Sequence, residues 1–340
     1  MSFVSHKARL RLTRRTAIPR QPFLLGDAHW GMFDTEDISQ ILSDERWYGD
    51  KPPHWEHAVK QAKAKEWWRK GHLRLARKPG RNAPFDTLAA HSVISSCKPR
   101  QRCKSNGCYL CCRAFQRWLI TALRWLQISP CREEYQDRSF TYIYPEGQCA
   151  IGTLRKANFK KHLQRTLQVI ENTGLVEFGI LAFDNSFNDD RAKFAHGEFH
   201  IPPELYWQIH LYGIIRTRDF DLVMDALRAA TPENEKIRQI VRARKSFDGK
   251  PKVLSYIFKP TAYKRQPFKV QKGSRKGDWA MGDAKALNAA QHVEYLVAAH
   301  ELGIPNRICL INLHPERTPP SPKRGRRYFF RKLLPRSTTM

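Results

Sequence analysis

The stretch Leu205-Tyr-Trp-Gln-Ile-His-Leu-Tyr-Gly-Ile-Ile-Arg216 decides the fold. It is rich in aromatic and β-branched residues, a composition that predicts a β-strand. Because side chains alternate along a strand, Gln208 and His210 project from one face, and Ile209 and Leu211 from the other. Two metal-capable groups on one face make half of a site for a hard cation. The alternative is a histidine that is simply a hydrogen-bonded part of the packing, and glutamine is a poor metal ligand.

An upstream apolar stretch, Gly179-Ile-Leu-Ala-Phe-Asp184, also predicts a strand, and it ends in a carboxylate. If this strand pairs with residues 205–216, Asp184 supplies a third, oxygen ligand. His196 and His200 lie in the polar stretch between the two strands, so the third ligand stays open at this point.

The elements around these two strands set the fold class. Helices are predicted where apolar residues recur at helical spacing, and strands where they alternate. The expected order is a strand at 139–144, a helix at 154–170 capped by Thr153, a strand at 175–183, a polar loop at 184–203, a strand at 205–216 and a helix at 219–230. This order predicts an α+β fold with an antiparallel sheet and flanking helices.

Charge is the strongest signal in the bulk composition. The 340 residues carry 60 Lys and Arg against 32 Asp and Glu, a formal net charge of +28. Such an excess predicts a polyanionic partner, and we expect nucleic acid rather than a membrane, because no apolar run is long enough to span a bilayer. Residues 1–20 are basic without an apolar core and favour a phosphate-binding arm over a transit peptide. We therefore expect a cytoplasmic protein associated with nucleoid or plasmid DNA.

Five of the eight cysteines fall between Cys97 and Cys112. Without an export signal, such clustering suits a metal better than disulfides. The spacing predicts a structural Zn²⁺ site with four thiolates, and the alternative is a group of buried free cysteines. The expected ligands are Cys97, Cys103, Cys108 and Cys111, with Cys112 as an alternative to Cys111. Basic residues in and beside this knuckle are expected to bind DNA phosphates: Lys98, Arg100, Arg102, Lys104 and Arg113.

A second chemical motif is Tyr256-Ile-Phe-Lys259. If the segment 253–259 is helical, Tyr256 and Lys259 share a face. A tyrosine hydroxyl attacks a phosphate only when a metal polarises the phosphate and a nearby cation stabilises the oxyanion. Lys259 meets the second requirement, although a core tyrosine beside a solvated lysine has the same spacing. Tyr263 is a second candidate nucleophile, and Lys264 and Arg265 beside it are expected to bind DNA.

The order of these motifs resembles that of the HUH-type rolling-circle replication initiators and the related single-strand transposases. The knuckle Cys103-Lys-Ser-Asn-Gly-Cys-Tyr-Leu-Cys111 precedes Phe140-Thr-Tyr-Ile-Tyr-Pro145, then the strand ending in an acid, the histidine strand and the Tyr-x-x-Lys motif. The resemblance covers roughly Cys97 to Arg265. It departs from the family at Gln208, where the first of two histidines is usual, and at Lys252 and Val253, where many members carry a glutamate.

The resemblance implies a single-strand DNA endonuclease and strand transferase. It assigns a Mg²⁺ or Mn²⁺ ion to His210, Gln208 and Asp184, the nucleophile to Tyr256 and its cationic partner to Lys259. The expected substrate is single-stranded DNA at an origin or an element end. The departures leave a non-catalytic, zinc-containing nucleic-acid-binding protein as the alternative, and net charge by itself does not separate DNA from RNA.

The expected organisation follows from these motifs and from changes in composition along the chain. It comprises a basic helical N-terminal region at 1–90, the knuckle and a helix at 91–130, an HUH-like nuclease domain at 131–270, a helical extension at 271–316 and a basic disordered tail at 317–340.

Overall fold

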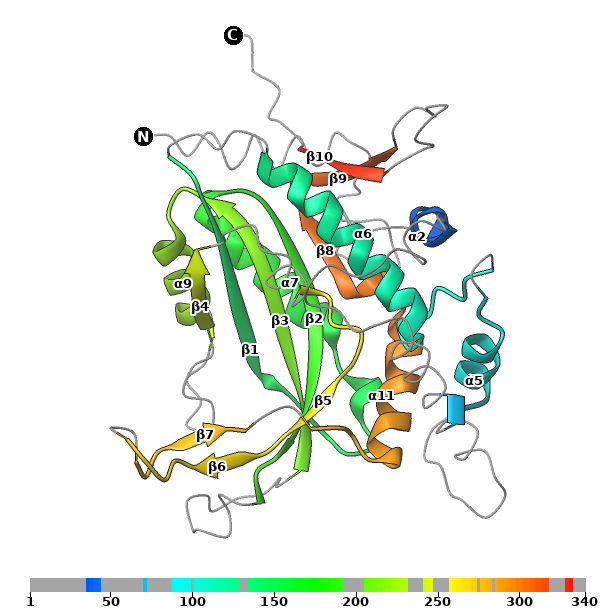
Figure 1. Cartoon of the computed structure of the whole chain (residues 1–340). Coiled ribbons are helices and arrows are strands. Elements are labelled where there is room, and N and C mark those ends of the chain that lie inside the picture. Colours follow the sequence, from blue (N-terminus) through cyan, green and yellow to red (C-terminus); the bar gives the residue numbers. More distant parts are fainter. Residues whose placement is uncertain are drawn as a thin grey trace.

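A central β-sheet forms the middle of the protein in a computed structural model (Figure 1). The structure describes residues 35–43, 70–71, 87–98, 101–128, 134–191, 205–231, 241–246, 257–273, 276–282, 285–317 and 328–332. The strands of the sheet are β1 (Gln136–Ala150), β2 (Val176–Asp189), β3 (Leu205–Thr217), β4 (Val241–Ser246), β5 (Tyr263–Arg265) and β8 (Ile308–Ile311).

The sheet has the order β4-β1-β3-β2-β5, and β8 pairs with a different part of β2. Strand β5 runs parallel to β2, whereas the other pairings are antiparallel. The expectation of an antiparallel sheet is therefore corrected to a mixed sheet in an α+β fold. A parallel pairing needs a long connection, and the chain between β2 and β5 passes through β3, α9 and β4 before it returns.

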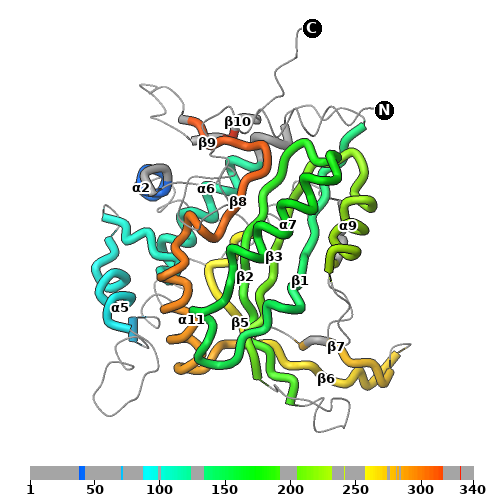
Figure 2. Tube along the Cα trace, turned by 180° about the vertical axis from the view of Figure 1, so that it is seen from behind, coloured from blue at the N-terminus to red at the C-terminus, as the bar shows by residue number. Residues whose placement is uncertain are grey.

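Helices α7 (Phe159–Thr173) and α9 (Phe220–Ala229) cover one face of the sheet, the face that Figure 2 turns toward the reader. Their apolar stripes are buried against the strands, which explains why these two amphipathic segments are helical here. Helix α6 (Tyr109–Ile128) lies toward the other side, next to β8 (Figure 1). Three further helices lie around α6 and the lower end of the sheet: α2 (Thr35–Ser43), α5 (Thr87–Ser95) and α11 (Ala289–Leu302).

Several element boundaries differ from those expected from the sequence. Strand β1 continues past Pro145 through an irregularity in its pairing with β3 between Ile143 and Gln148. The segment expected as one helix from 154 divides into the short 3₁₀ helix η1 (Leu154–Lys156) and α7. The side chain of Asn158, not of Thr153, caps α7 by accepting from the backbone N–H of Lys161. Strand β2 does not end at Asp184 but extends to Asp189.

Two antiparallel hairpins extend the fold near its C-terminal end. Strands β6 (Pro267–Lys269) and β7 (Trp279–Met281) form one of them. Strands β9 (Leu313–Arg317) and β10 (Tyr328–Lys332) form the other, after the 3₁₀ helix η2 (Pro305–Arg307) and β8. Residues 328–332 were expected to belong to a disordered tail, but Phe330 is buried with its ring 5.3 Å from that of Trp118 on α6. Among the described helices, none is both long and apolar enough to cross a membrane.

Candidate functional site

Four cysteines converge at the N-terminal end of α6, as their spacing predicts. The sulfur atoms of Cys97, Cys103, Cys108 and Cys111 all lie within 4.8 Å of one another. The sulfur of Cys97 is 3.6 Å from those of Cys108 and Cys111, and Cys103 is 3.6 Å from Cys111. Four thiolates about 2.3 Å from one Zn²⁺ ion would be separated by about 3.8 Å. The cluster can therefore hold a metal such as zinc.

The fifth cysteine of the motif is not part of the cluster. Cys112 donates from its sulfur to the backbone carbonyl of Asn106 at 3.0 Å. The interpretation with Cys111 as the fourth ligand is therefore the one that the geometry favours. The neighbouring thiols, first that of Cys103, hold the pKa of Cys97 below the usual value for a thiol and raise those of Cys108 and Cys111.

The basic residues of the knuckle differ in their exposure. Arg102 and Arg113 are buried, and Arg113 donates to Gln116 Oε1 at 2.7 Å inside α6. Little of either side chain is exposed, so their predicted contact with DNA phosphates stays a prediction. Lys98 is exposed and Lys104 is half-buried with a positive φ of 58°. Arg100 lies outside the described residues.

The second candidate group lies on one face of the sheet. Asp184 of β2 is the cross-strand partner of His210 on β3, and Ser186 is the partner of Gln208. Their neighbour Phe183 faces α7, where its ring is 5.3 Å from that of Phe159. Because side chains alternate, Asp184, Gln208 and His210 face away from α7. The sequence correctly predicts that these three side chains share a face.

Hydrogen bonds fix the orientation of Gln208 and His210. Gln208 is 2% exposed and donates from Nε2 to the carbonyl of Tyr144 at 2.6 Å, where β1 departs from regular pairing. Because Nε2 points at that carbonyl, the other amide atom, Oε1, points away from it. The imidazole of His210 lies with Nε2 2.6 Å from the hydroxyl of Ser186. The bulge in β1 and the serine on β2 therefore set how these two side chains are presented.

Lys259 reaches the same face from the segment after the Tyr-x-x-Lys motif. Its ammonium donates to Asp184 Oδ2 at 3.1 Å and to the hydroxyl of Tyr212 at 2.9 Å. Burial lowers the pKa of Lys259, but the Asp184 charge and the Tyr212 hydroxyl together outweigh burial and hold that pKa above its usual value. Burial likewise raises the pKa of Asp184, and the charges of Lys259 and Arg307 hold it below its usual value. Both groups are therefore charged at neutral pH.

The donors on this face suit a hard cation. Asp184 Oδ1 and Gln208 Oε1 are buried, and neither accepts a hydrogen bond from any residue that the structure describes. A buried oxygen acceptor left in this state is costly unless a cation or water satisfies it, and the Arg307 guanidinium already lies 3.8 Å from Asp184 Oδ1. One carboxylate oxygen, one amide oxygen and one imidazole form a set that Mg²⁺ or Mn²⁺ accepts.

Arg307 connects the two candidate groups, and sequence reasoning missed it. Its guanidinium, 3% exposed, donates to Asn106 Oδ1 in the knuckle at 3.0 Å and to the carbonyls of Phe183 at 2.7 Å and Lys259 at 2.6 Å. It also lies 3.8 Å from Asp184 Oδ1. The preceding Gly303 and Pro305 mark the end of α11, but nothing in the local sequence indicates a buried cation.

The candidate nucleophile Tyr256 lies outside the described residues, as do His196, His200 and most of the segment 253–259 expected to be helical. At the described end of that segment, Ile257 is helical, Phe258 lies in a turn and Lys259 is not helical. Tyr263, the alternative nucleophile, is the register partner of Ser186 on β5 and so belongs to the same face of the sheet.

Of the two other predicted DNA contacts, Lys264 is largely buried and pairs with Asp189 at 2.8 Å, whereas Arg265 is half-buried on β5.

Comparisons of the chain with protein-family models, with curated proteins and with solved structures found no match.

Proposed function

We propose that this chain is a single-strand DNA endonuclease and strand transferase of the rolling-circle initiator type, acting on plasmid or nucleoid DNA in the cytoplasm. One observation carries the proposal: Lys259 of the Tyr-x-x-Lys motif contacts Asp184, the cross-strand partner of His210. Three motifs that are far apart in the sequence therefore converge on one buried polar face. The motif order of the HUH initiators is what gives this convergence its chemical meaning.

In the proposed reaction, His210, Gln208 and Asp184 hold a Mg²⁺ or Mn²⁺ ion. When bound, such an ion polarises the scissile phosphate. The hydroxyl oxygen of Tyr256 forms a bond to phosphorus, and the bond from phosphorus to the 3′ oxygen breaks. The tyrosine proton ends on that oxygen, which leaves a 5′-phosphotyrosine and a free 3′-hydroxyl. Lys259 places a positive charge beside the acid and is suited to steady the developing anion.

The test uses single-stranded DNA incubated with the purified chain and Mn²⁺. The label is on the part of the DNA that lies 3′ of the candidate cleavage point, because the 5′-phosphate of that part becomes joined to the protein. The expected product is a protein–DNA adduct that survives denaturation in the original chain and in Tyr263→Phe but is absent from Tyr256→Phe. If Tyr263→Phe forms no adduct and Tyr256→Phe still forms one, the nucleophile is Tyr263 instead of Tyr256. Failure of every origin or element-end DNA to form an adduct would contradict the proposed chemistry.

A second candidate function is non-catalytic nucleic-acid binding by a zinc-containing protein. The observation that favours it is Gln208, which stands where the HUH initiators usually have a histidine and whose amide donates to the carbonyl of Tyr144. Binding without catalysis predicts that His210→Ala combined with Tyr256→Phe leaves every function unchanged, whereas Cys108→Ser abolishes it. The nicking proposal predicts instead that the combined His210→Ala and Tyr256→Phe changes abolish adduct formation.

A further inference from the structure

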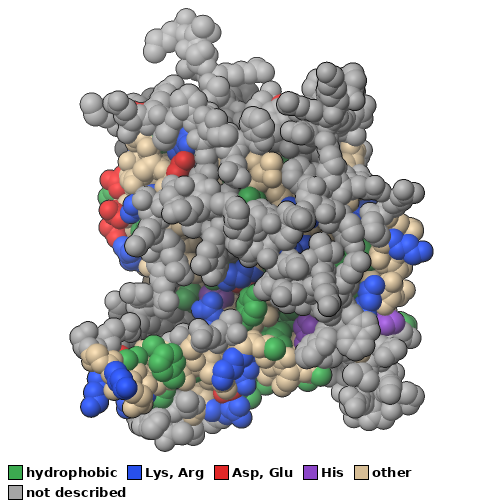
Figure 3. Space-filling model, in the orientation of Figure 1, with side chains coloured by type: hydrophobic (Ala, Val, Ile, Leu, Met, Phe, Trp, Pro, Cys, Tyr) green, Lys and Arg blue, Asp and Glu red, His purple; other side chains and the backbone are tan. Residues whose placement is uncertain are grey.

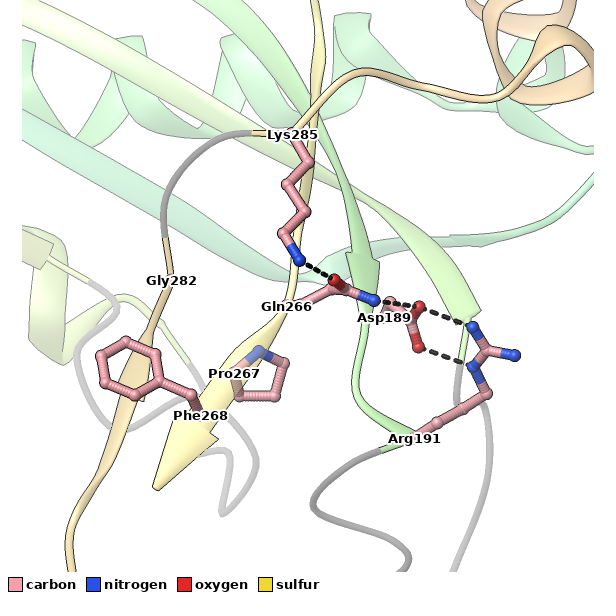
Figure 4. Close-up of a pocket in the computed structure, with 7 residues that line it drawn as sticks. All are labelled: Asp189, Arg191, Gln266, Pro267, Phe268, Gly282 and Lys285. Carbon is pink, nitrogen blue, oxygen red and sulfur yellow. Dashed lines mark hydrogen bonds and ion pairs between the residues drawn. The ribbon is translucent and has the colours of Figure 1, made fainter. Parts of the chain in front are cut away.

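A cavity of about 730 Å³ opens at the end of β2, beside Asp189. Figure 4 shows its lining residues, which come from the end of β2, from β6 and from the segment after β7: Asp189, Arg191, Gln266, Pro267, Phe268, Gly282 and Lys285. In the space-filling view, Lys and Arg side chains gather over β5 and the β6–β7 hairpin (Figure 3). The cavity thus lies within a basic part of the described surface.

One wall of the cavity is a network of polar groups organised by Asp189. The carboxylate, 2% exposed, accepts from Arg191 at 2.8 Å through both oxygens, and from Gln266 at 2.9 Å. Lys264 lies 2.8 Å from it. Gln266 in turn accepts from Lys285 Nζ at 2.8 Å (Figure 4). The donors around the cavity are therefore held in place before any ligand arrives.

The network leaves this wall cationic. Arg191 above all holds the pKa of Asp189 below its usual range, so the carboxylate is ionised at neutral pH. Three cationic side chains, Arg191, Lys264 and Lys285, still exceed that one negative charge. Arg191 is 55% exposed as a side chain and Lys285 is exposed, so both are accessible to an anion. The charge balance and the accessible guanidinium suit a phosphate group.

The opposite wall is apolar. Phe268 on β6 is 49% exposed, one of few large hydrophobic side chains that the described surface leaves in the open, and Pro267 lies beside it. Backbone hydrogen bonds across the β6–β7 hairpin hold Phe268 in position, and Gly282 N–H donates to the carbonyl of Gln266 at 2.9 Å. An exposed aromatic ring beside accessible cations is the combination on which proteins stack the bases of a single strand.

We propose that this cavity binds one nucleotide of single-stranded DNA, with the base against Phe268 and its phosphate at Arg191 and Lys285. The assignment rests on the proposed function for its choice of DNA. The cavity and the acid of the candidate metal site lie on the same strand: Asp189 follows Asp184 by five positions of β2, or about 17 Å.

The base contact is tested with a fluorescein-labelled oligothymidylate of roughly twelve nucleotides and with the same strand made abasic. Binding to the full chain is followed by anisotropy without divalent ions, so no cleavage is needed. Phe268→Ala is expected to weaken binding of the normal strand on the order of tenfold. The same substitution leaves affinity for the abasic strand unchanged, whereas Phe268→Tyr binds like the original chain. The matched control is Leu222→Ala, an equally exposed apolar residue on α9.

The phosphate contact is tested through salt dependence. Lys285→Ala is expected to lower the slope of log affinity against log salt by about 0.7, the value for one phosphate contact of a single strand. The matched control is Lys156→Ala, an exposed lysine of η1 outside the cavity, which keeps the original slope. A midpoint of thermal unfolding equal to that of the original chain shows that each variant is folded.

Equal affinity of the original chain and Phe268→Ala for the normal strand, together with an unchanged slope for Lys285→Ala, would overturn the nucleotide site. A matched RNA strand bound as tightly as DNA would overturn its assignment to DNA. Failure of the nicking proposal gives a different pattern. In that case the two substitutions still weaken binding, but no chain forms a covalent adduct.

Discussion

Among the residues that the structure describes, Arg307 contacts both the knuckle and the sheet face. It contacts Asn106 on one side and Asp184, Phe183 and Lys259 on the other. The backbone carbonyl of Lys259 is one of its acceptors, so Arg307 also fixes the segment from which the Lys259 ammonium reaches the acid. A change in the knuckle can therefore reach the sheet face through one side chain.

Replacing Arg307 with alanine is expected to lower the free energy of unfolding by about 3 kcal/mol or more, because buried acceptors and the Asp184 charge lose their partner. Urea denaturation measures the loss. Asn106→Ala alone removes one of these bonds, and the double variant should show a coupling of about 1 kcal/mol between the two positions. Arg228→Ala, an exposed ion pair on α9, is the control and should stay within about 0.5 kcal/mol. If the losses in the free energy of unfolding from Arg307→Ala and Asn106→Ala simply add in the double variant, the two residues are not coupled and the proposed link between the knuckle and the sheet face is contradicted.

Asp189→Asn is expected to lower the free energy of unfolding by about 2 kcal/mol at pH 7, because its bonds are made to a charged group. The folded-state pKa of Asp189 is below the usual value of about 3.9, so its stabilisation is complete above that value. It is lost as the pH falls through the lower folded-state pKa. The difference between the two proteins should thus narrow below about pH 4. Denaturation at several pH values measures it, and a difference that is constant with pH would contradict the assignment.

At the scale of elements, the sequence predicts what depends on local pattern. The amphipathic periods of α6, α7 and α9 and the aromatic and β-branched composition of β3 correctly predict those elements. The extension of β2 past Asp184 could not be predicted, because its polar residues Asn185, Ser186 and Asn188 are typical of a loop. They form a strand since β3 and β5 supply their hydrogen-bond partners on both sides. Tertiary pairing overrides local propensity there.

The spacing of the cysteines correctly predicts the four-cysteine cluster. Its geometry distinguishes Cys108, a member of the cluster, from Cys112, which lies outside it. Purified protein should contain about one zinc per chain, and Cys108→Ser should lose it, because three thiolates and a hydroxyl bind zinc poorly. Cys112→Ser should keep the metal, since Cys112 bonds to Asn106 instead. Atomic emission after dialysis measures both. Loss of zinc from Cys112→Ser with retention in Cys108→Ser would contradict the ligand assignment.

For the whole molecule, the site is less predictable than the fold because it is assembled by packing. Strand alternation places Gln208 and His210 on one face, and Asp184 joins them because β2 and β3 pair in one particular register. The arrival of Lys259 and Arg307 depends on how distant segments fold over the sheet, which no local pattern encodes. Burial of Arg102 and Arg113 has the same origin: a basic sequence does not reveal which cations face inward.

The central claim is that the face formed by Asp184, Gln208 and His210 holds a divalent ion. Titration of Mn²⁺ into the zinc-loaded chain, followed by electron paramagnetic resonance of the free ion, tests it without requiring a DNA substrate. The expected result is about one bound Mn²⁺ per chain, with binding strongly weakened in His210→Ala and in Asp184→Asn but unchanged in Cys112→Ser. Absence of a site in the original chain, or equal Mn²⁺ binding by the original chain and His210→Ala, would contradict the account.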